Sequence, residues 1–276
     1  MTSGDKPYDD TRPPDPPGAR FRPDLVYSAQ GSRLHVYVRT APGERRPCVV
    51  LIHGGGWQEY DAFMLIRYAH RLAAAGYVAV AIDFRQVGEA PWPACLHDAK
   101  CAVRWVRAHA EELGADRDRV VVAGNSAGGQ LAALIAATPG EQEGSGGWHH
   151  ESSAVASAFL IYPVVDLRPE AGEWQRDQAI PVLFGADGDR AEITRASPMA
   201  RVHSAMPPVW TVTGDRDQIV LLEQVQRYHA ELDRHGVSNQ LHVVEGDHGF
   251  DWAPAGWELT ARLLLNHLAH VADLRA

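Results

Sequence analysis

The apolar residues of this chain fall into short runs that are separated by polar turns and by segments of helical spacing. Six of the runs are continuous, which is typical of strands buried on both faces of a sheet. They cover residues 48–53, 77–84, 119–125, 156–165, 209–214 and 239–246. Residues 32–40 instead alternate between apolar and polar side chains, and this alternation predicts an antiparallel strand.

Helices are predicted between these strands. Segments of helical spacing, or of small apolar residues, cover residues 65–73, 103–113, 127–137, 221–232 and 264–271. Gly76 and Gly236 follow two of these segments at the position of a helix C-cap. Because strand and helix alternate from Cys48 onward, we expect an α/β fold with a mostly parallel central sheet and helices on both of its faces.

Two segments fall outside this alternation. Residues 1–24 carry six prolines and predict a flexible arm ahead of a single domain at 25–276. Residues 166–208 contain helix-like pieces but no strong strand, and they are long for a connection. Because ligands of α/β sheets bind outside the carboxyl ends of the strands, we expect this insertion to form a small lid there.

Composition excludes several classes of protein. The 276 residues are 45% hydrophobic and 22% charged, which allows a large core and argues against wholesale disorder. The net charge of −9 argues against nucleic acid or an anionic membrane as a partner. No apolar run approaches the ~18 residues of a membrane span, and no signal peptide is recognisable. Three cysteines without a C-x-x-C pair argue against a disulfide framework, so a cytoplasmic protein is expected.

The most specific motif is GNSAGG at residues 124–129, which follows a predicted strand and precedes a predicted helix. This is the context of a nucleophile turn, where a serine sits on a strained strand-to-helix connection. Close packing there requires glycine two positions before and two positions after the serine. The helix N-terminus supplies free N–H groups and the positive end of a dipole for developing negative charge. Ser126 is therefore the predicted nucleophile.

A second glycine-rich segment, HGGGW at residues 53–57, follows another predicted strand. Consecutive glycines let the backbone approach a ligand and aim N–H groups at one point. Such donors make an oxyanion hole when they lie ~2.7–3.1 Å from the developing charge. The alternative is a turn needed only for chain direction. A dinucleotide-binding loop is excluded because G-x-G-x-x-G would need glycine in place of Glu59.

A serine nucleophile also needs a general base and an acid that orients it. Among 14 histidines, His248 is favoured because it follows the last predicted strand and can reach a serine above the sheet. Asp217 is the favoured acid because it opens the helix after the fifth strand. Asp215 competes with it, and a turn-capping role is its alternative. Asp247 is set aside because side chains adjacent in sequence rarely converge.

These motifs resemble the α/β-hydrolase esterases and lipases related to hormone-sensitive lipase. HGGGW, GNSAGG, GDRDQIV and GDHGF occur in the family order, and the similarity covers roughly residues 25–276. The order Ser…Asp…His is the one that this fold uses. The resemblance implies that Ser126 is the nucleophile and that Asp217 and His248 are its partners. It implies oxyanion donors in the backbone N–H groups of Gly55, Gly56 and Ala127.

The short lid and Trp57 also resemble acetyl-esterase-like and feruloyl-esterase-like proteins and kynurenine formamidases. Two positions depart from these patterns. The formamidases carry an aromatic residue at the position of Gly56, which disfavours that activity. Family members often have tyrosine where this chain has Phe84, a change that affects none of the catalytic roles.

We therefore expect a serine hydrolase that cleaves carboxylic esters of small molecules through an acyl-enzyme, with no metal ion and no organic cofactor. Four aromatic residues are candidates for an apolar substrate pocket or for core packing: Trp57, Trp92, Trp174 and Phe184. Three alternatives stay open, namely amide or formamide hydrolysis, a lyase, epimerase or acyltransferase reaction at the same site, and a non-catalytic receptor. The sequence does not decide between a monomer and a homodimer.

Overall fold

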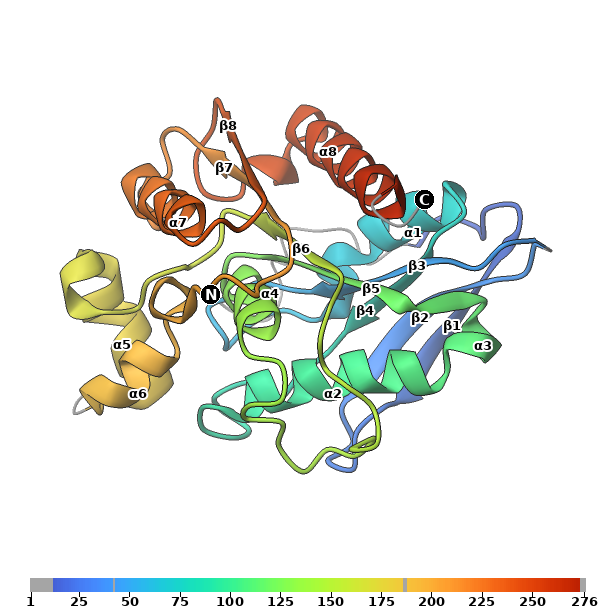
Figure 1. The fold of residues 1–276 in the computed structure, drawn as a ribbon, viewed down its shortest axis with the longest axis horizontal. Coiled ribbons are helices and arrows are strands. Elements are labelled where there is room, and N and C mark those ends of the chain that lie inside the picture. The colour runs from blue at the N-terminus through green and yellow to red at the C-terminus, as the bar shows by residue number, and fades with distance from the viewer. Residues whose placement is uncertain (1–11, 42, 186–187, 274–276) are drawn as a thin grey trace.

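Eight strands form one sheet in the part of the chain that the computed structural model describes, which is residues 12–41, 43–185 and 188–273 (Figure 1). Their bounds are Ala19–Val26 (β1), Arg33–Arg39 (β2), Arg46–Ile52 (β3), Val78–Ile82 (β4), Ala115–Asn125 (β5), Ser157–Ile161 (β6), Val209–Gly214 (β7) and Asn239–Val244 (β8). They lie in the order β1-β2-β4-β3-β5-β6-β7-β8. β2 pairs antiparallel with both β1 and β4, and all pairs from β4 to β8 are parallel.

Helices cover both faces of this sheet. Their bounds are Ile66–Ala74 (α1), Ala94–Ala108 (α2), Ala110–Leu113 (α3), Ala127–Ala137 (α4), Ile180–Phe184 (α5), Arg190–Arg195 (α6), Leu222–Arg234 (α7) and Pro254–Asp273 (α8). α1 and α8 pack on one face, while α2, α4 and α7 pack on the other (Figure 1). The prediction of a mostly parallel sheet between two helical layers is therefore confirmed.

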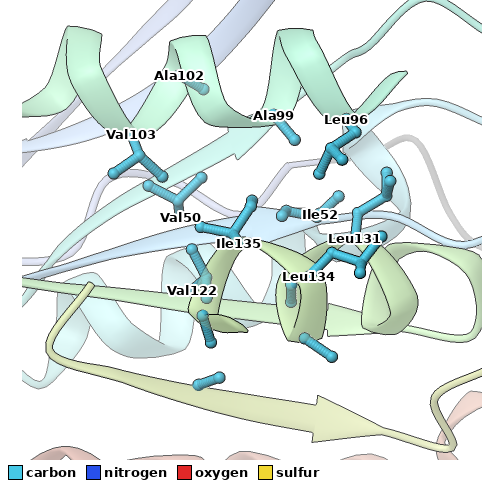
Figure 2. Close-up of a cluster of buried hydrophobic side chains, with 14 of the residues drawn as sticks. Val50, Ile52, Leu96, Ala99, Ala102, Val103, Val122, Leu131, Leu134 and Ile135 are labelled. Atoms are coloured by element: carbon cyan, nitrogen blue, oxygen red, sulfur yellow. The ribbon is translucent and has the colours of Figure 1, made fainter. Parts of the chain in front are cut away.

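The central strand β3 shows why the apolar runs are continuous. Val49 and Leu51 contact the layer of α1 and α8, whereas Val50 and Ile52 contact the layer of α2 and α4. Figure 2 shows the second contact, in which side chains of α2 and α4 close over Val50 and Ile52. Because every position of β3 after Arg46 is buried, each large apolar side chain contributes roughly 1.5–3 kcal/mol to folding.

Part of the segment that the sequence predicts as an N-terminal arm forms a strand. Residues 1–11 of the expected arm at 1–24 lie outside the described residues, and Ala19–Val26 form the edge strand β1. The register of β1 shifts between Arg22 and Leu25, next to Pro23. Proline is tolerated at an edge strand or a bulge because no ladder hydrogen bond is lost there. The prolines of this segment therefore predict a flexible arm at a position where the chain forms a strand.

The insertion at 166–208 contains α5, α6, two short 3₁₀ helices and a π-helix at Gln175–Ala179, and no strand among its described residues. It lies on the side of the molecule opposite β1 (Figure 1). Throughout the described residues, no helix combines the length and the apolar character that a bilayer crossing requires.

Candidate active site

Ser126 occupies a strained turn between β5 and α4. Its backbone has φ 53° and ψ −118°, a conformation that costs a non-glycine residue about 1–3 kcal/mol. A Cβ atom on Gly124 would lie 2.4 Å from the carbonyl oxygen of Gly128, and one on Gly128 would lie 2.0 Å from that of Ile52. The strand, the helix and β3 thus approach too closely for any side chain, and this contact explains both glycines of the motif.

The three predicted catalytic side chains lie together. Oγ of Ser126 is 2.9 Å from Nε2 of His248, and Nδ1 of His248 is 2.7 Å from Oδ2 of Asp217. The other oxygen of Asp217 accepts the N–H groups of Ile219 and Val220, both at 2.9 Å. Asp217 is therefore held at the start of its loop, where it orients the imidazole. This geometry allows His248 to accept a proton from Ser126.

The competing carboxylates have other contacts. Oδ1 of Asp215 accepts the N–H of Gly246 at 3.0 Å, as a turn-capping residue would. Asp247 is exposed and lies 3.6 Å from Arg216. These contacts leave Asp217 as the carboxylate beside His248.

The loop after β3 brings the glycines of the HGGGW motif beside the serine turn. Gly55 and Gly56 both have positive φ, at 102° and 57°. A Cβ atom on Gly55 would lie 2.2 Å from the carbonyl oxygen of Glu59, so this tight turn requires glycine. The N–H of Gly54 donates to Oδ1 of Asn125 at 2.9 Å. That bond ties the loop to the residue before Ser126.

The backbone N–H groups of Gly55, Gly56 and Ala127, which the sequence predicts as oxyanion donors, lie in the two turns beside Ser126. Within the described residues, the hydrogen bonds of the loop do not use the N–H groups of Gly55 and Gly56. Ala127 is the first residue of α4, and N–H groups in the first turn of a helix lack an intrahelical partner. Beneath the loop, His53 is buried with Nδ1 2.7 Å from the carbonyl oxygen of Gly54, and burial lowers its pKa.

A cavity of about 280 Å³ opens over these groups, and Ser126 and His248 are part of its wall. The insertion at 166–208 contributes Trp174, Gln178, Ala179 and Val182 to the lining. Trp57 also lines the cavity, stacks on Trp174 with ring centroids 6.3 Å apart, and donates to Oε1 of Gln130 at 3.1 Å. Two of the four candidate aromatic residues, Trp57 and Trp174, thus lie at the site.

The other two candidates pack elsewhere. Trp92 and Phe184 contact each other edge to face, with centroids 5.9 Å apart, and neither lines the cavity. Their hypothetical role in the substrate pocket is corrected to packing against the core. Sequence reasoning missed Trp252 and Ile219, which do line the cavity. Trp252 could have been found from its position four residues after His248.

Histidines elsewhere do not form a metal site in the described part of the chain, where no group of three or more histidine, cysteine, aspartate or glutamate side chains could hold an ion. His267 lies in the long C-terminal helix α8. It is fully buried, and its Nε2 is 2.8 Å from Oγ of Ser157. Burial lowers the pKa of His267 to about 3.

The strand order and the serine turn after β5 define an α/β-hydrolase. Comparison with known families makes this more specific: the chain belongs to the BD-FAE family, whose model matches residues 34–232. The resemblance to α/β-hydrolase esterases that the motifs indicate is thereby confirmed.

Two of the curated relatives are esterases of Mycobacterium tuberculosis. Esterase LipQ is 29% identical over 83% of this chain and 57% of LipQ. Esterase LipC is 30% identical over 76% of this chain and 54% of LipC. The chain therefore spans about half the length of these relatives.

Solved structures share the fold over nearly the whole chain. A truncated carbohydrate esterase from gut microbiota has a TM-score of 0.82 at 22% identity, covering 94% of this chain and all of that one. The propionate-bound thermophilic esterase Est2 of Thermogutta terrifontis has a TM-score of 0.77 at 28% identity, covering 94% and 96% of the two chains.

Proposed function

We propose that this protein is a serine carboxylesterase that cleaves carboxylic esters of small molecules through an acyl-enzyme. The observation that carries the proposal is the hydrogen-bonded line from Ser126 through His248 to Asp217, which lies at the wall of a cavity. The names of LipQ and LipC as esterases support this class of reaction.

In the proposed mechanism, His248 removes the proton of Ser126 while the serine oxygen attacks the ester carbonyl carbon. The carbonyl oxygen becomes an oxyanion, and the N–H groups of Gly55, Gly56 and Ala127 stabilise it. His248 then gives its proton to the leaving alcohol as the C–O bond breaks. In the second half of the reaction, His248 removes a proton from a water molecule, whose oxygen attacks the acyl carbon. The bond to Ser126 breaks, His248 returns the proton to the serine oxygen, and the carboxylic acid leaves.

We infer that residues 166–208 act as a lid that shapes the pocket for the substrate. Trp174 and Val182 supply apolar surface to the same cavity that Ser126 lines. The solved Est2 structures hold propionate and butyrate. A cavity of about 280 Å³ is compatible with short acyl groups, which we therefore expect as preferred substrates.

The test is turnover of a panel of p-nitrophenyl esters and N-formyl aromatic amines by the full chain. We expect hydrolysis of the esters, with short acyl groups preferred. Ser126→Ala should lower kcat by about 10⁴–10⁶-fold because the triad acts as a unit. A fluorophosphonate should label Ser126 and leave the variant unlabelled. Turnover of formamides without esters, or labelling at another residue, would contradict the proposal.

A further inference from the structure

A line of buried polar groups runs behind the candidate catalytic residues. The N–H of Gly54 donates to Oδ1 of Asn125 at 2.9 Å, and Nδ2 of Asn125 donates to Oη of Tyr162 at 3.1 Å. Oη of Tyr162 in turn donates to Oδ1 of Asp251 at 2.6 Å. We call these four residues the polar line. It connects the glycine loop, the end of β5, the residue after β6 and the turn that follows His248.

The polar line also supports the imidazole of His248. The ring of Tyr162 meets that of His248 edge to face, with centroids 4.6 Å apart. Tyr162 has φ 35°, which is rare for a bulky residue and needs surrounding contacts to hold it. Asp251 lies three residues after His248 and is 5% exposed. The same set of contacts therefore fixes the glycine loop on one side and the base on the other.

Asp251 is a carboxylate whose partners are two hydroxyl groups. Oη of Tyr68, from α1, donates to its Oδ2 at 2.8 Å, while Tyr162 donates to Oδ1. Burial raises the pKa of Asp251, and the two tyrosine hydroxyls oppose that shift by stabilising the charged form. In the mechanism proposed above, Asp251 has no role.

The carboxylate of Asp251 sets the direction of the two side-chain hydrogen bonds in the polar line. Both oxygens of Asp251 accept from tyrosine hydroxyls, so the single proton of the Tyr162 hydroxyl points to Asp251. The Tyr162 oxygen must then accept from Asn125, which turns the amide NH₂ of Asn125 toward Tyr162. The carbonyl oxygen of Asn125 is thereby left to face the N–H of Gly54, as the 2.9 Å contact requires.

We propose that Asp251 is a positioning residue that fixes the orientation of the Asn125 amide and, through the Gly54 N–H, the placement of the glycine loop. The inference rests on the proposed function, because the N–H groups of Gly55 and Gly56 are the proposed oxyanion donors. We expect Asp251 to affect the stabilisation of the transition state, because only there do these donors contact a developing negative charge. Substrate binding in the ground state does not depend on it.

Asp251→Asn changes the direction of the hydrogen bonds along the polar line with almost no change in the shape of the side chain. The new amide can donate to Tyr162, whose proton is then free to turn toward Asn125. The Asn125 amide rotates in response, and its NH₂ meets the N–H of Gly54, so that two donors face each other. We expect kcat for p-nitrophenyl acetate to fall about 10- to 100-fold with KM within about threefold, as for a misplaced oxyanion donor. Tyr162→Phe, which cuts the polar line but keeps the ring, should have the same effect.

Tyr68→Phe is the matched control. It removes the other donor to the same buried carboxylate and leaves the polar line intact. We expect it to lower the melting temperature as much as Asp251→Asn does, because an acceptor loses its partner, while kcat stays within about threefold. A purely structural role of Asp251 predicts instead that the two variants lower kcat equally, or that neither does. Either of those results would overturn the inference.

An NMR readout separates this inference from the proposed function. The backbone amide resonances of Gly54, Gly55 and Gly56 should move in Asp251→Asn and Tyr162→Phe and keep their positions in Tyr68→Phe. If the wild type turns over no ester but the amides respond in this way, the proposed function fails and the positioning role holds. If the amides do not move in Asp251→Asn, the positioning role is wrong whatever the turnover. Tyr162→Phe supplies the same decision if Asp251→Asn does not fold.

Discussion

At the scale of single residues, Asp215 and Asp217 lie two positions apart after β7 but have different surroundings. The carboxylate of Asp215 holds the N–H of Gly246 and so closes the turn before His248. The carboxylate of Asp217 is buried, holds two N–H groups of its own loop, and contacts the imidazole. One aspartate therefore serves the backbone, and the other serves the proposed base.

Replacing each aspartate by asparagine should separate these roles. Asp217→Asn should lower kcat by about 10³–10⁴-fold, since the triad acid orients and stabilises the imidazolium, while its amide oxygen still accepts from the loop. Asp215→Asn should lower kcat by less than about tenfold, because a turn cap contributes roughly 1 kcal/mol to stability. Steady-state kinetics and thermal melts of both variants check this. A larger loss of activity in Asp215→Asn would show that the acid is assigned to the wrong aspartate.

The residues predictable from the sequence are those that local chain geometry demands. At Gly124 and Gly128 there is no room for a Cβ atom, so the glycines in the motif around Ser126 predict the tight strand-to-helix turn. Cavity residues such as Val182 depend on how the 166–208 insertion packs against the sheet, and no short-range pattern encodes that packing. The same reason explains why Trp174 and Phe184 could not be told apart from sequence.

At the scale of secondary structure, strands were easier to predict than helices with buried charges. α2 begins at Ala94, although apolar spacing predicts a helix only from residue 103. Its first half buries Lys100, whose ammonium donates to the carbonyl oxygens of Thr138 and Glu141. Arg104 donates in the same way to the carbonyl oxygen of Gly147. Lys100 and Arg104 thereby hold the loop after α4. Because both are charged, a prediction from the spacing of apolar residues does not identify this part of α2.

The 166–208 insertion supports a prediction with its own control. Trp174→Ala should raise KM for bulky acyl esters about tenfold or more, because a lost apolar contact is worth ~1–3 kcal/mol. Turnover of acetyl esters should stay within about tenfold, since the oxyanion donors are untouched. Phe184→Ala removes an aromatic residue of the same insertion that packs on Trp92 outside the cavity. It should lower the melting temperature and leave the acyl preference unchanged.

Kinetics over an acyl-length series and parallel thermal melts of both variants decide the matter. An altered acyl preference in Phe184→Ala, or an unaltered one in Trp174→Ala, would contradict the placement of these residues relative to the pocket.

At the scale of the whole molecule, α8 and α1 form one of the two helical layers, and a buried histidine connects α8 to the sheet. Nε2 of His267 contacts Oγ of Ser157 at the start of β6, and its ring packs against Trp210 of β7. His267 is fully buried, and burial lowers its pKa to about 3 from an ordinary value of 6.5. The folded protein thus holds this side chain in its neutral form, whereas the unfolded chain protonates it below pH 6.5.

The sign of the resulting pH dependence follows from this depressed pKa. The contribution of neutral His267 to stability is fully present above pH 6.5 and is lost as the pH falls toward 3. Between pH 6.5 and pH 4, the wild type should lose roughly 2–3 kcal/mol of unfolding free energy through this group. His267→Gln cannot be protonated, so its unfolding free energy should fall less steeply over the same range, even if it is less stable at pH 7.

Other buried histidines add to the acid sensitivity of the wild type, so the test is a difference between variants. Urea unfolding followed by tryptophan fluorescence at several pH values from 4 to 7 measures the slope for each protein. His149→Gln is the control, because His149 is exposed and its removal should leave the slope of the wild type unchanged. A His267→Gln slope parallel to that of the wild type would mean that His267 becomes protonated inside the fold. The link between α8 and β6 would then tolerate a charge, and the acid sensitivity would have to come from other groups.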